Sequence, residues 1–205
     1  GITNQYYFNN YFRNVKDKNM NIKDLKAKWN KEKEHYRKQE LGSGIHSFVK
    51  DFLESEDLFR LKEGRLSGKD VLRKNEYIHE NKAKEGRKAD FVIYISPEIV
   101  VPLEAECYGN IQAGIKQLIN YQKDFDKHYG ILTDGYTWRF YNNNIYREFN
   151  LDQIIDETDI FLEFWKEYIK PEFYYLTFFE PQGQLSLLKE ERLPVEENRQ
   201  IFFDD

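Results

Sequence analysis

This chain of 205 residues has a single cysteine, and it lacks metal-ligand spacing of its histidines, phosphate-binding loop motifs and long apolar runs. The single Cys107 cannot form a disulfide within the chain and is typical of a reducing compartment, so we expect a cytoplasmic protein. The four histidines lack metal-ligand spacing, which argues against a structural zinc site. Neither a GxxxxGK nor a GxGxxG pattern occurs, so nucleotide hydrolysis on a phosphate-binding loop is not supported.

Long apolar runs are also lacking. No stretch of about 18 apolar residues exists and the first residues are polar and aromatic, so we expect no transmembrane helix, no signal peptide and no membrane partner. The chain begins with Gly1 rather than Met and ends at Asp205 without a clear stop. We therefore expect it to be a piece of a longer protein.

Charge is unevenly distributed behind a net charge of −5. Residues 13–40 and 60–88 each carry ten Lys and Arg against five Asp and Glu, whereas residues 150–205 carry five against fourteen. A phosphate-bearing substrate would meet the N-terminal half, although each basic run can equally be a solvated helix face.

Three carboxylates interrupt two apolar, β-branched runs. Asp90 lies in the first run, and Glu104 and Glu106 lie in the second. Buried carboxylates are costly unless a counter-charge compensates them, and a divalent metal ion is the obvious candidate. These residue types in this pattern therefore predict a metal site.

The two runs predict a β-hairpin of residues 91–95 and 99–103. If Ile95 pairs with Ile99, Asp90 lies directly opposite Glu104, at roughly 5 Å between side chains on one face. Glu106 is two residues beyond Glu104 and points to the same face. A register slip by one residue would separate the three carboxylates.

The rest of the pattern alternates helices and strands. We expect helices over 22–39, 44–56, 111–125 and 156–170, strands over 129–133, 136–141 and 145–149, and a tight turn at Asp134-Gly135. Residues 58–85 predict an irregular connection or an extra strand. His46, near the start of the second helix, is either a ligand or phosphate contact or a surface histidine. The fold class is therefore α/β, with a short mixed central sheet flanked by helices.

Five blocks in this order resemble the PD-(D/E)xK nuclease superfamily, most closely the N-terminal nuclease domains of type I and type IIG restriction-modification enzymes. The blocks are RKADF (87–91), VPLEAE (101–106), QLINY (117–121), YGILTDG (129–135) and WRFY (138–141). The resemblance covers roughly residues 44–149. It implies a restriction-endonuclease-like core at 44–149, a basic helical segment at 1–43, and an acidic, largely helical C-terminal extension at 150–205 that leads to further domains.

The resemblance also implies a function and a site. The expected activity is Mg²⁺-dependent hydrolysis of phosphodiester bonds in double-stranded DNA, with Mn²⁺ able to substitute. Methyltransferase, motor or specificity domains would be the partners. The implied metal ligands are Asp90, Glu104, Glu106, the carbonyl of Ala105 and Glu40. Gln117 and Tyr121 would hold the substrate backbone or second-shell groups, and the expected phosphate contacts are Lys84, Arg87, Lys88 and Lys116.

One position departs from the family pattern. The family usually has Glu-x-Lys, and this chain has Glu106 at the third position. An ionised carboxylate cannot donate a hydrogen bond to the attacking water, although it can accept a proton or bind metal. Lys116 is an alternative source of the missing lysine. The alternative function is a catalytically degenerate module that binds DNA or scaffolds its neighbours, while a sugar hydrolase with two carboxylates explains fewer of these residues.

Overall fold

The computed structural model describes residues 19–38, 44–64, 75–82, 88–96, 99–124 and 128–170. Within these residues a seven-stranded mixed sheet has each strand beside its sequence neighbour, and only the β1/β2 and β4/β5 pairs are parallel. The strands are β1 Lys62–Glu63, β2 Glu76–Lys82, β3 Lys88–Ser96, β4 Ile99–Ala105, β5 Tyr129–Thr133, β6 Thr137–Asn142 and β7 Ile145–Asn150. The predicted α/β class and mixed sheet are confirmed. The sheet is wider than expected, because the segment before the hairpin supplies β1 and β2.

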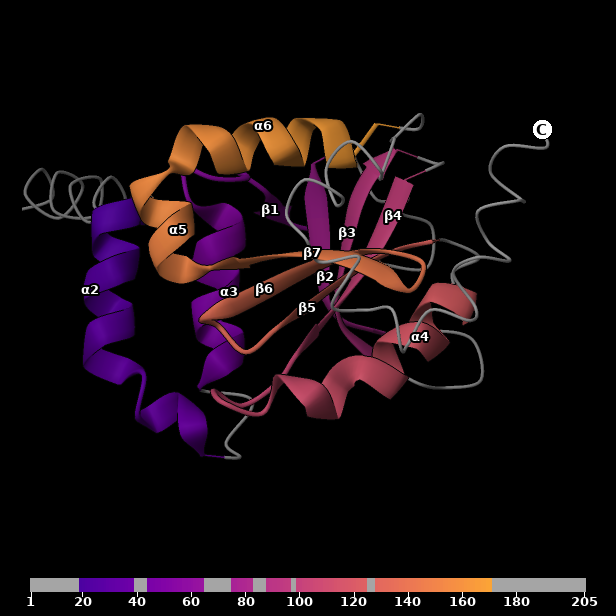
Figure 1. The fold of residues 1–205 in the computed structure, drawn as a ribbon, viewed down its shortest axis with the longest axis horizontal. Coiled ribbons are helices and arrows are strands. Elements are labelled where there is room, and N and C mark those ends of the chain that lie inside the picture. The colour runs from indigo at the N-terminus through magenta and orange to yellow at the C-terminus, as the bar shows by residue number, and fades with distance from the viewer. Residues whose placement is uncertain are drawn as a thin grey trace, which may run out of the picture.

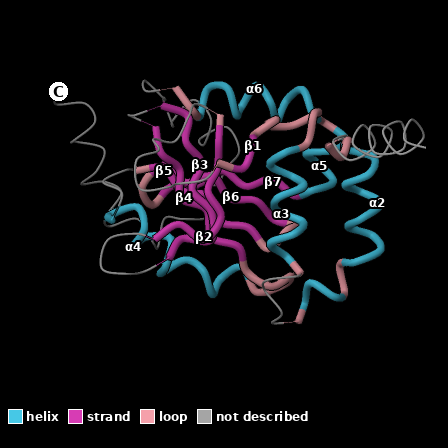
Figure 2. Tube along the Cα trace, turned by 180° about the vertical axis from the view of Figure 1, so that it is seen from behind, coloured by secondary structure: helices cyan, strands magenta, loops and turns pink. Residues whose placement is uncertain are grey.

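The helices lie on both faces of this sheet (Figures 1 and 2). The α-helices are α2 Ile22–Glu32, α3 Ile45–Glu54, α4 Ile115–Asp124, α5 Leu151–Asp156 and α6 Thr158–Tyr168, and two 3₁₀ turns are η1 His35–Arg37 and η3 Ile111–Gly114. Helices α2, α3, α5 and α6 share one large core with one face of the sheet, and α4 packs against the other face over β4 and β5. The η3–α4 segment makes the crossover between the parallel strands β4 and β5.

Helix α3 follows directly from its sequence pattern. Ile45, Phe48, Val49, Phe52 and Leu53 recur at helical spacing, and all five side chains are buried on one face of the helix. The continuous helix expected over 22–39 is interrupted, because α2 ends at Glu32. The following 3₁₀ turn directs the Tyr36 side chain into the core.

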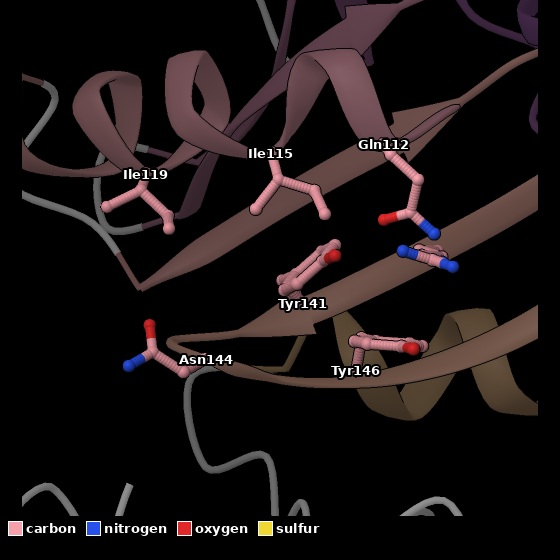
Figure 3. A pocket seen from close by; sticks show the side chains of 7 residues that line it. Gln112, Ile115, Ile119, Tyr141, Asn144 and Tyr146 are labelled. Carbon is pink, nitrogen blue, oxygen red and sulfur yellow. The ribbon is translucent and has the colours of Figure 1, made fainter. Parts of the chain in front are cut away.

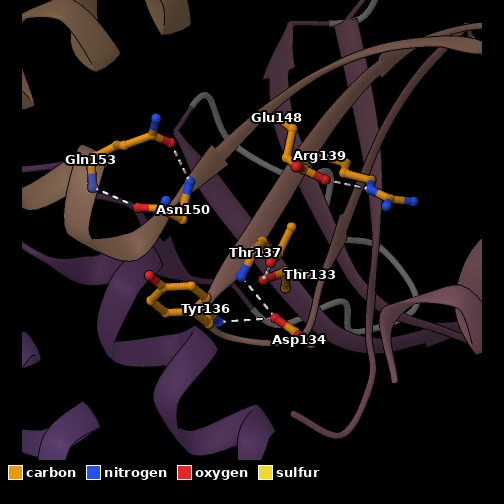
Figure 4. A network of polar contacts seen from close by, with 8 residues as sticks. All are labelled: Thr133, Asp134, Tyr136, Thr137, Arg139, Glu148, Asn150 and Gln153. Atoms are coloured by element: carbon orange, nitrogen blue, oxygen red, sulfur yellow. Dashed lines mark hydrogen bonds and ion pairs between the residues drawn. The ribbon is translucent and has the colours of Figure 1, made fainter. Parts of the chain in front are cut away.

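The C-terminal helical region begins earlier than predicted. Asn150 accepts a hydrogen bond from Gln153 N at 2.8 Å while Gln153 Oε1 accepts one from Asn150 N at 2.9 Å, a capping box that starts α5 (Figure 4). On α6 the side chains of Phe161, Phe164, Trp165 and Tyr168 are buried, whereas Ile160 is 51% exposed. Helices α2, α5 and α6 share the core with residues 44–149, and the predicted three-segment division stays a prediction.

The turn between β5 and β6 is displaced by one residue from its predicted position. Thr133 pairs with Trp138, so Gly135 and Tyr136 occupy the centre of the turn rather than Asp134 and Gly135. Asp134 instead precedes the turn, and its Oδ1 accepts hydrogen bonds from Tyr136 N at 3.0 Å and Thr137 N at 2.7 Å (Figure 4). Gly135 has a φ of +88°, a backbone conformation that glycine adopts readily because it has no Cβ.

Candidate active site

The hairpin β3–β4 has the register that the sequence predicts over most of its length. Phe91 pairs with Leu103 and the pairing continues in step to Tyr94 and Val100. The predicted Ile95–Ile99 pair is wrong, because an irregularity near the loop makes Ser96 the partner of Ile99. This shift lies at the far end of the hairpin from the carboxylates. The opposition of Asp90 and Glu104, which depends only on the regular part, is therefore retained.

Asp90 is tied to the neighbouring strand through its side chain. Its Oδ2 accepts a hydrogen bond from Ala105 N at 2.9 Å, and about a fifth of the side chain is exposed. A charged acceptor of a backbone N–H bond is held in a fixed position more firmly than a free side chain. Asp90 therefore holds the last residue of β4 and stands at the end of the hairpin beside Glu104.

Glu104 is the most strongly perturbed carboxyl in the described residues. It is 5% exposed, and its Oε2 is buried with no hydrogen-bond partner in the described part of the chain. Burial, first, and then the negative charges of Asp90 and Glu106 raise the pKa of Glu104 to about 9. This raised pKa favours the protonated form of Glu104 near neutral pH. A cation between the carboxyl groups would displace that proton.

Glu106 follows β4 and faces the same group of charges. Its backbone N–H donates to Thr133 O at 2.8 Å, which fixes the chain there against β5. Burial and then the charge of Asp90 raise the pKa of Glu106, and His46 opposes this shift. The side chain lies against Gly114, where an added Cβ would stand 3.0 Å from Glu106 Cγ and Oε1. Gly114 thus allows η3 to approach Glu106 closely.

His46 completes the group, and its surface interpretation is wrong. The side chain is buried, with Nδ1 3.0 Å from His79 Nε2 and Nε2 3.6 Å from Asp90 Oδ2. His46 Nε2 has no hydrogen-bond partner among the described residues. Its burial was visible in the sequence, since His46 shares a helical face with Val49 and Leu53 at i+3 and i+7.

His79 was missed in the sequence. It lies on β2 opposite Phe91, and the His79 ring stacks on Phe91 with centroids 4.9 Å apart. Only the packing of α3 on the sheet brings His79 to His46, because 33 residues separate the two in the chain. No local pattern marks it as part of a site.

The remaining predicted residues fall in several places. Lys116 and Gln117 are exposed on α4, while Tyr121 is buried against Ala89 and Val92. Gln117 and Tyr121 thus differ in environment, and their expected roles stay predictions. The side chain of Lys88, at the start of β3, and the residues Glu40, Lys84 and Arg87 lie outside what the structure describes.

Metal-binding geometry is incomplete as the side chains stand. Among the described residues, no three His, Cys, Asp or Glu side chains are grouped so that they could hold a metal ion. Mg²⁺, however, usually takes one or two protein carboxylates and completes its shell with water and substrate phosphate. The unpartnered Oε2 of Glu104 and the adjacent Asp90 meet that smaller requirement.

Comparisons of the chain with family models, with curated proteins and with solved structures find no match. In the described part of the chain, no helix has both the length and the apolar character needed to cross a bilayer.

Proposed function

We propose that this chain is a Mg²⁺-dependent endonuclease domain with a restriction-endonuclease-like fold, which hydrolyses phosphodiester bonds in DNA. The observation that carries the proposal is the meeting of Asp90 and Glu104 at one end of the β3–β4 hairpin, with Glu106 and His46 beside them. Supporting this, α3 precedes the hairpin and a helical crossover follows it, which is the element order of the resembling domains.

The buried charge of the site fits a divalent cation. Glu104 has a buried oxygen without a hydrogen-bond partner among the described residues, and burial with neighbouring negative charges raises the pKa of Glu104 and of Glu106. Carboxyl groups whose pKa is raised by burial and by neighbouring charges are typical of functional sites. When bound, Mg²⁺ would supply a Lewis acid for the phosphate and a more acidic water.

Residues of the chain would bind the cation, accept a proton and position these groups. Asp90 and Glu104 would hold the cation, with the Ala105 carbonyl as a further ligand by resemblance. Glu106 would accept a proton from the attacking water, since its raised pKa brings it closer to the operating pH. His46 is a positioning residue: His79 engages its Nδ1 and its Nε2 faces Asp90.

The wider assignment is also part of the proposal. Gln117 and Tyr121 would hold the substrate backbone or second-shell groups, and the basic residues Lys84, Arg87, Lys88 and Lys116 would contact the phosphates. The domain would act within a larger restriction-modification enzyme, where methyltransferase, motor or specificity domains select the target. Mn²⁺ would substitute for Mg²⁺, since both prefer oxygen ligands.

The test measures plasmid nicking and metal binding on the same samples. We expect the wild type to nick plasmid DNA with Mg²⁺ or Mn²⁺, and Asp90→Asn, which can still accept the Ala105 N–H bond, to lose activity at least about 100-fold. Asp159→Asn, an exposed carboxylate on α6, is the matched control and should retain activity.

Titration calorimetry separates the two possible functions. Binding of Mn²⁺ that Asp90→Asn abolishes, together with nicking, supports the nuclease. Metal binding without nicking would replace it with the non-cleaving module. Absence of both binding and nicking would refute a metal site at these residues.

A further inference from the structure

A pocket of about 300 Å³ lies between the η3–α4 segment and the β6–β7 hairpin. Figure 3 shows Ile115 and Ile119 pointing from the helix toward the hairpin, where Tyr141 and Tyr146 present their rings. The volume is at the small end of the range for ligand sites. It suits one flat group of the size of a nucleobase and is too small for a base pair.

The lining combines apolar faces with amide groups. Tyr141 and Tyr146 have ring centroids 5.0 Å apart, and the two isoleucines close the opposite side. Gln112 and Asn144 stand at different edges of the same space (Figure 3). Aromatic rings stack on any base, and Asn and Gln amides pair with the donors and acceptors on base edges.

The charge in the pocket is already compensated. Arg139 Nε donates to Glu148 at 2.9 Å, and its guanidinium carbon lies 4.6 Å from the centroid of the Tyr146 ring. Such an arginine is a weak site for a phosphate, because its charge has a partner. The pocket therefore favours a neutral, planar group over an anion.

Strand pairing connects the pocket to the carboxylates. Glu104 pairs with Leu132 and Leu132 pairs with Arg139, so Glu104 and Arg139 share one row and one face of the sheet. Two strand spacings amount to about 10 Å, or about three rises of 3.4 Å along one strand of B-DNA. The η3 turn also joins the two places, since Gly114 touches Glu106 and Gln112 lines the pocket.

We propose that this pocket binds one unstacked nucleobase of the DNA strand, within a few nucleotides of the phosphate that the carboxylates address. The part of this proposal that places the base near a cleavage site rests on the proposed nuclease function. A single-base pocket requires the base to leave its stack, so the preferred substrate near the cut is unpaired or distorted DNA.

The test observes the pocket directly, without metal or cleavage. The side-chain amide signals of Gln112 and Asn144 are followed in a ¹⁵N correlation spectrum during titration with each of the four deoxynucleosides. We expect both signals to shift with at least one nucleoside and to ignore methyl deoxyriboside. Tyr146→Leu should weaken this binding about tenfold or more, because the stacking surface is lost. Tyr94→Leu, a half-buried tyrosine on β3 outside the pocket, should not.

The outcomes separate this inference from the proposed function. Amide signals that ignore all four nucleosides would overturn base binding, even in a protein that nicks plasmid. Nucleoside binding by a protein that fails the nicking and metal-binding tests would refute the nuclease and leave a base-binding pocket. Equal weakening by Tyr146→Leu and Tyr94→Leu would place the base elsewhere and also overturn the inference.

Discussion

The aromatic core and the carboxylate end of the hairpin are built on opposite principles. In the core, Phe52 stacks on Trp138 at 3.8 Å and Phe59 on Trp165 at 3.9 Å. The buried Tyr168 hydroxyl accepts from Gly130 N and donates to Tyr141 O. At the hairpin end, the buried Glu104 lies beside the half-buried Asp90 and Glu106, and Glu104 Oε2 has no hydrogen-bond partner among the described residues.

This difference indicates which region is shaped by stability and which by a ligand. Stacked, hydrogen-bonded aromatics lower the free energy of the folded chain by themselves. Neighbouring buried carboxyl groups raise it, and apolar replacement of buried charges is often neutral or stabilising. A chain that keeps them gives up stability at one place, as functional sites commonly do. Substitutions in the two regions should therefore have effects of opposite sign.

The largest effect is expected in the core. Trp138→Ala removes a fully buried indole that stacks on Phe52 and donates to Gly135 O at 3.1 Å. We expect the free energy of unfolding in urea to fall by about 3–5 kcal/mol. Ile160→Ala, on the exposed side of α6, is the control and should change it by less than about 0.5 kcal/mol. Similar losses for both variants would mean that the core is not packed as described.

The opposite sign is expected for Glu104→Gln. At pH 7 the folded chain must take up a proton at Glu104 that the unfolded chain releases, and a neutral Gln avoids that cost, so the metal-free protein should become more stable by about 1–3 kcal/mol. The same variant should lose Mn²⁺ binding in calorimetry. Exposed Glu163→Gln on α6 is the matched control and should alter neither quantity. A destabilised Glu104→Gln protein would contradict the contrast between the two regions.

The pH dependence follows from the same group. Glu104 has a folded pKa of about 9 against an ordinary 4.5, so the folded state retains a proton that the unfolded chain releases. Its contribution to stability is full below pH 4.5 and is lost as the pH rises toward 9, by at most about 1.4 kcal/mol per pH unit. Urea unfolding at several pH values should show this slope in wild type. A slope that persists unchanged in Glu104→Gln would assign it to another group.

A smaller effect is expected where η3 meets Glu106. In Gly114→Ala the new Cβ would lie 2.5 Å from Leu132 Cδ1, so we expect a loss of about 1–2 kcal/mol in thermal or urea unfolding and weaker Mn²⁺ binding. The double variant Gly114→Ala with Leu132→Val makes room on one side only. Recovery of both stability and metal binding in that variant would show that displacement of Glu106 is not the cause.

The smallest effect concerns the start of α5. Asn150→Ala removes the side chain that accepts from Gln153 N, and we expect a loss of about 1 kcal/mol in thermal unfolding. Asn150→Ser keeps a capping oxygen and should lose only a fraction of that value. Metal binding should be unaffected in both variants, because the cap starts α5, which packs in the aromatic core.

Local patterns predicted the parts of the fold that depend on near neighbours. The apolar spacing of α3 and the regular register of β3 with β4 were readable, since burial of one face fixes both. The turn at Asp134 was misplaced by one residue, because a side chain that accepts two backbone bonds competes with the usual turn pattern. The capping box at Asn150, within an acidic segment, was not predicted.

By itself, the sequence determined the α/β class and the opposition of Asp90 and Glu104, because alternation along two adjacent strands needs only a short loop to bring them together. The tertiary structure decided what surrounds them. His46, His79 and Gly114 arrive from a helix, a distant strand and a crossover turn, and the row from Glu104 to Arg139 crosses three strands. Contacts between elements far apart in the chain depend on packing, which no local pattern encodes.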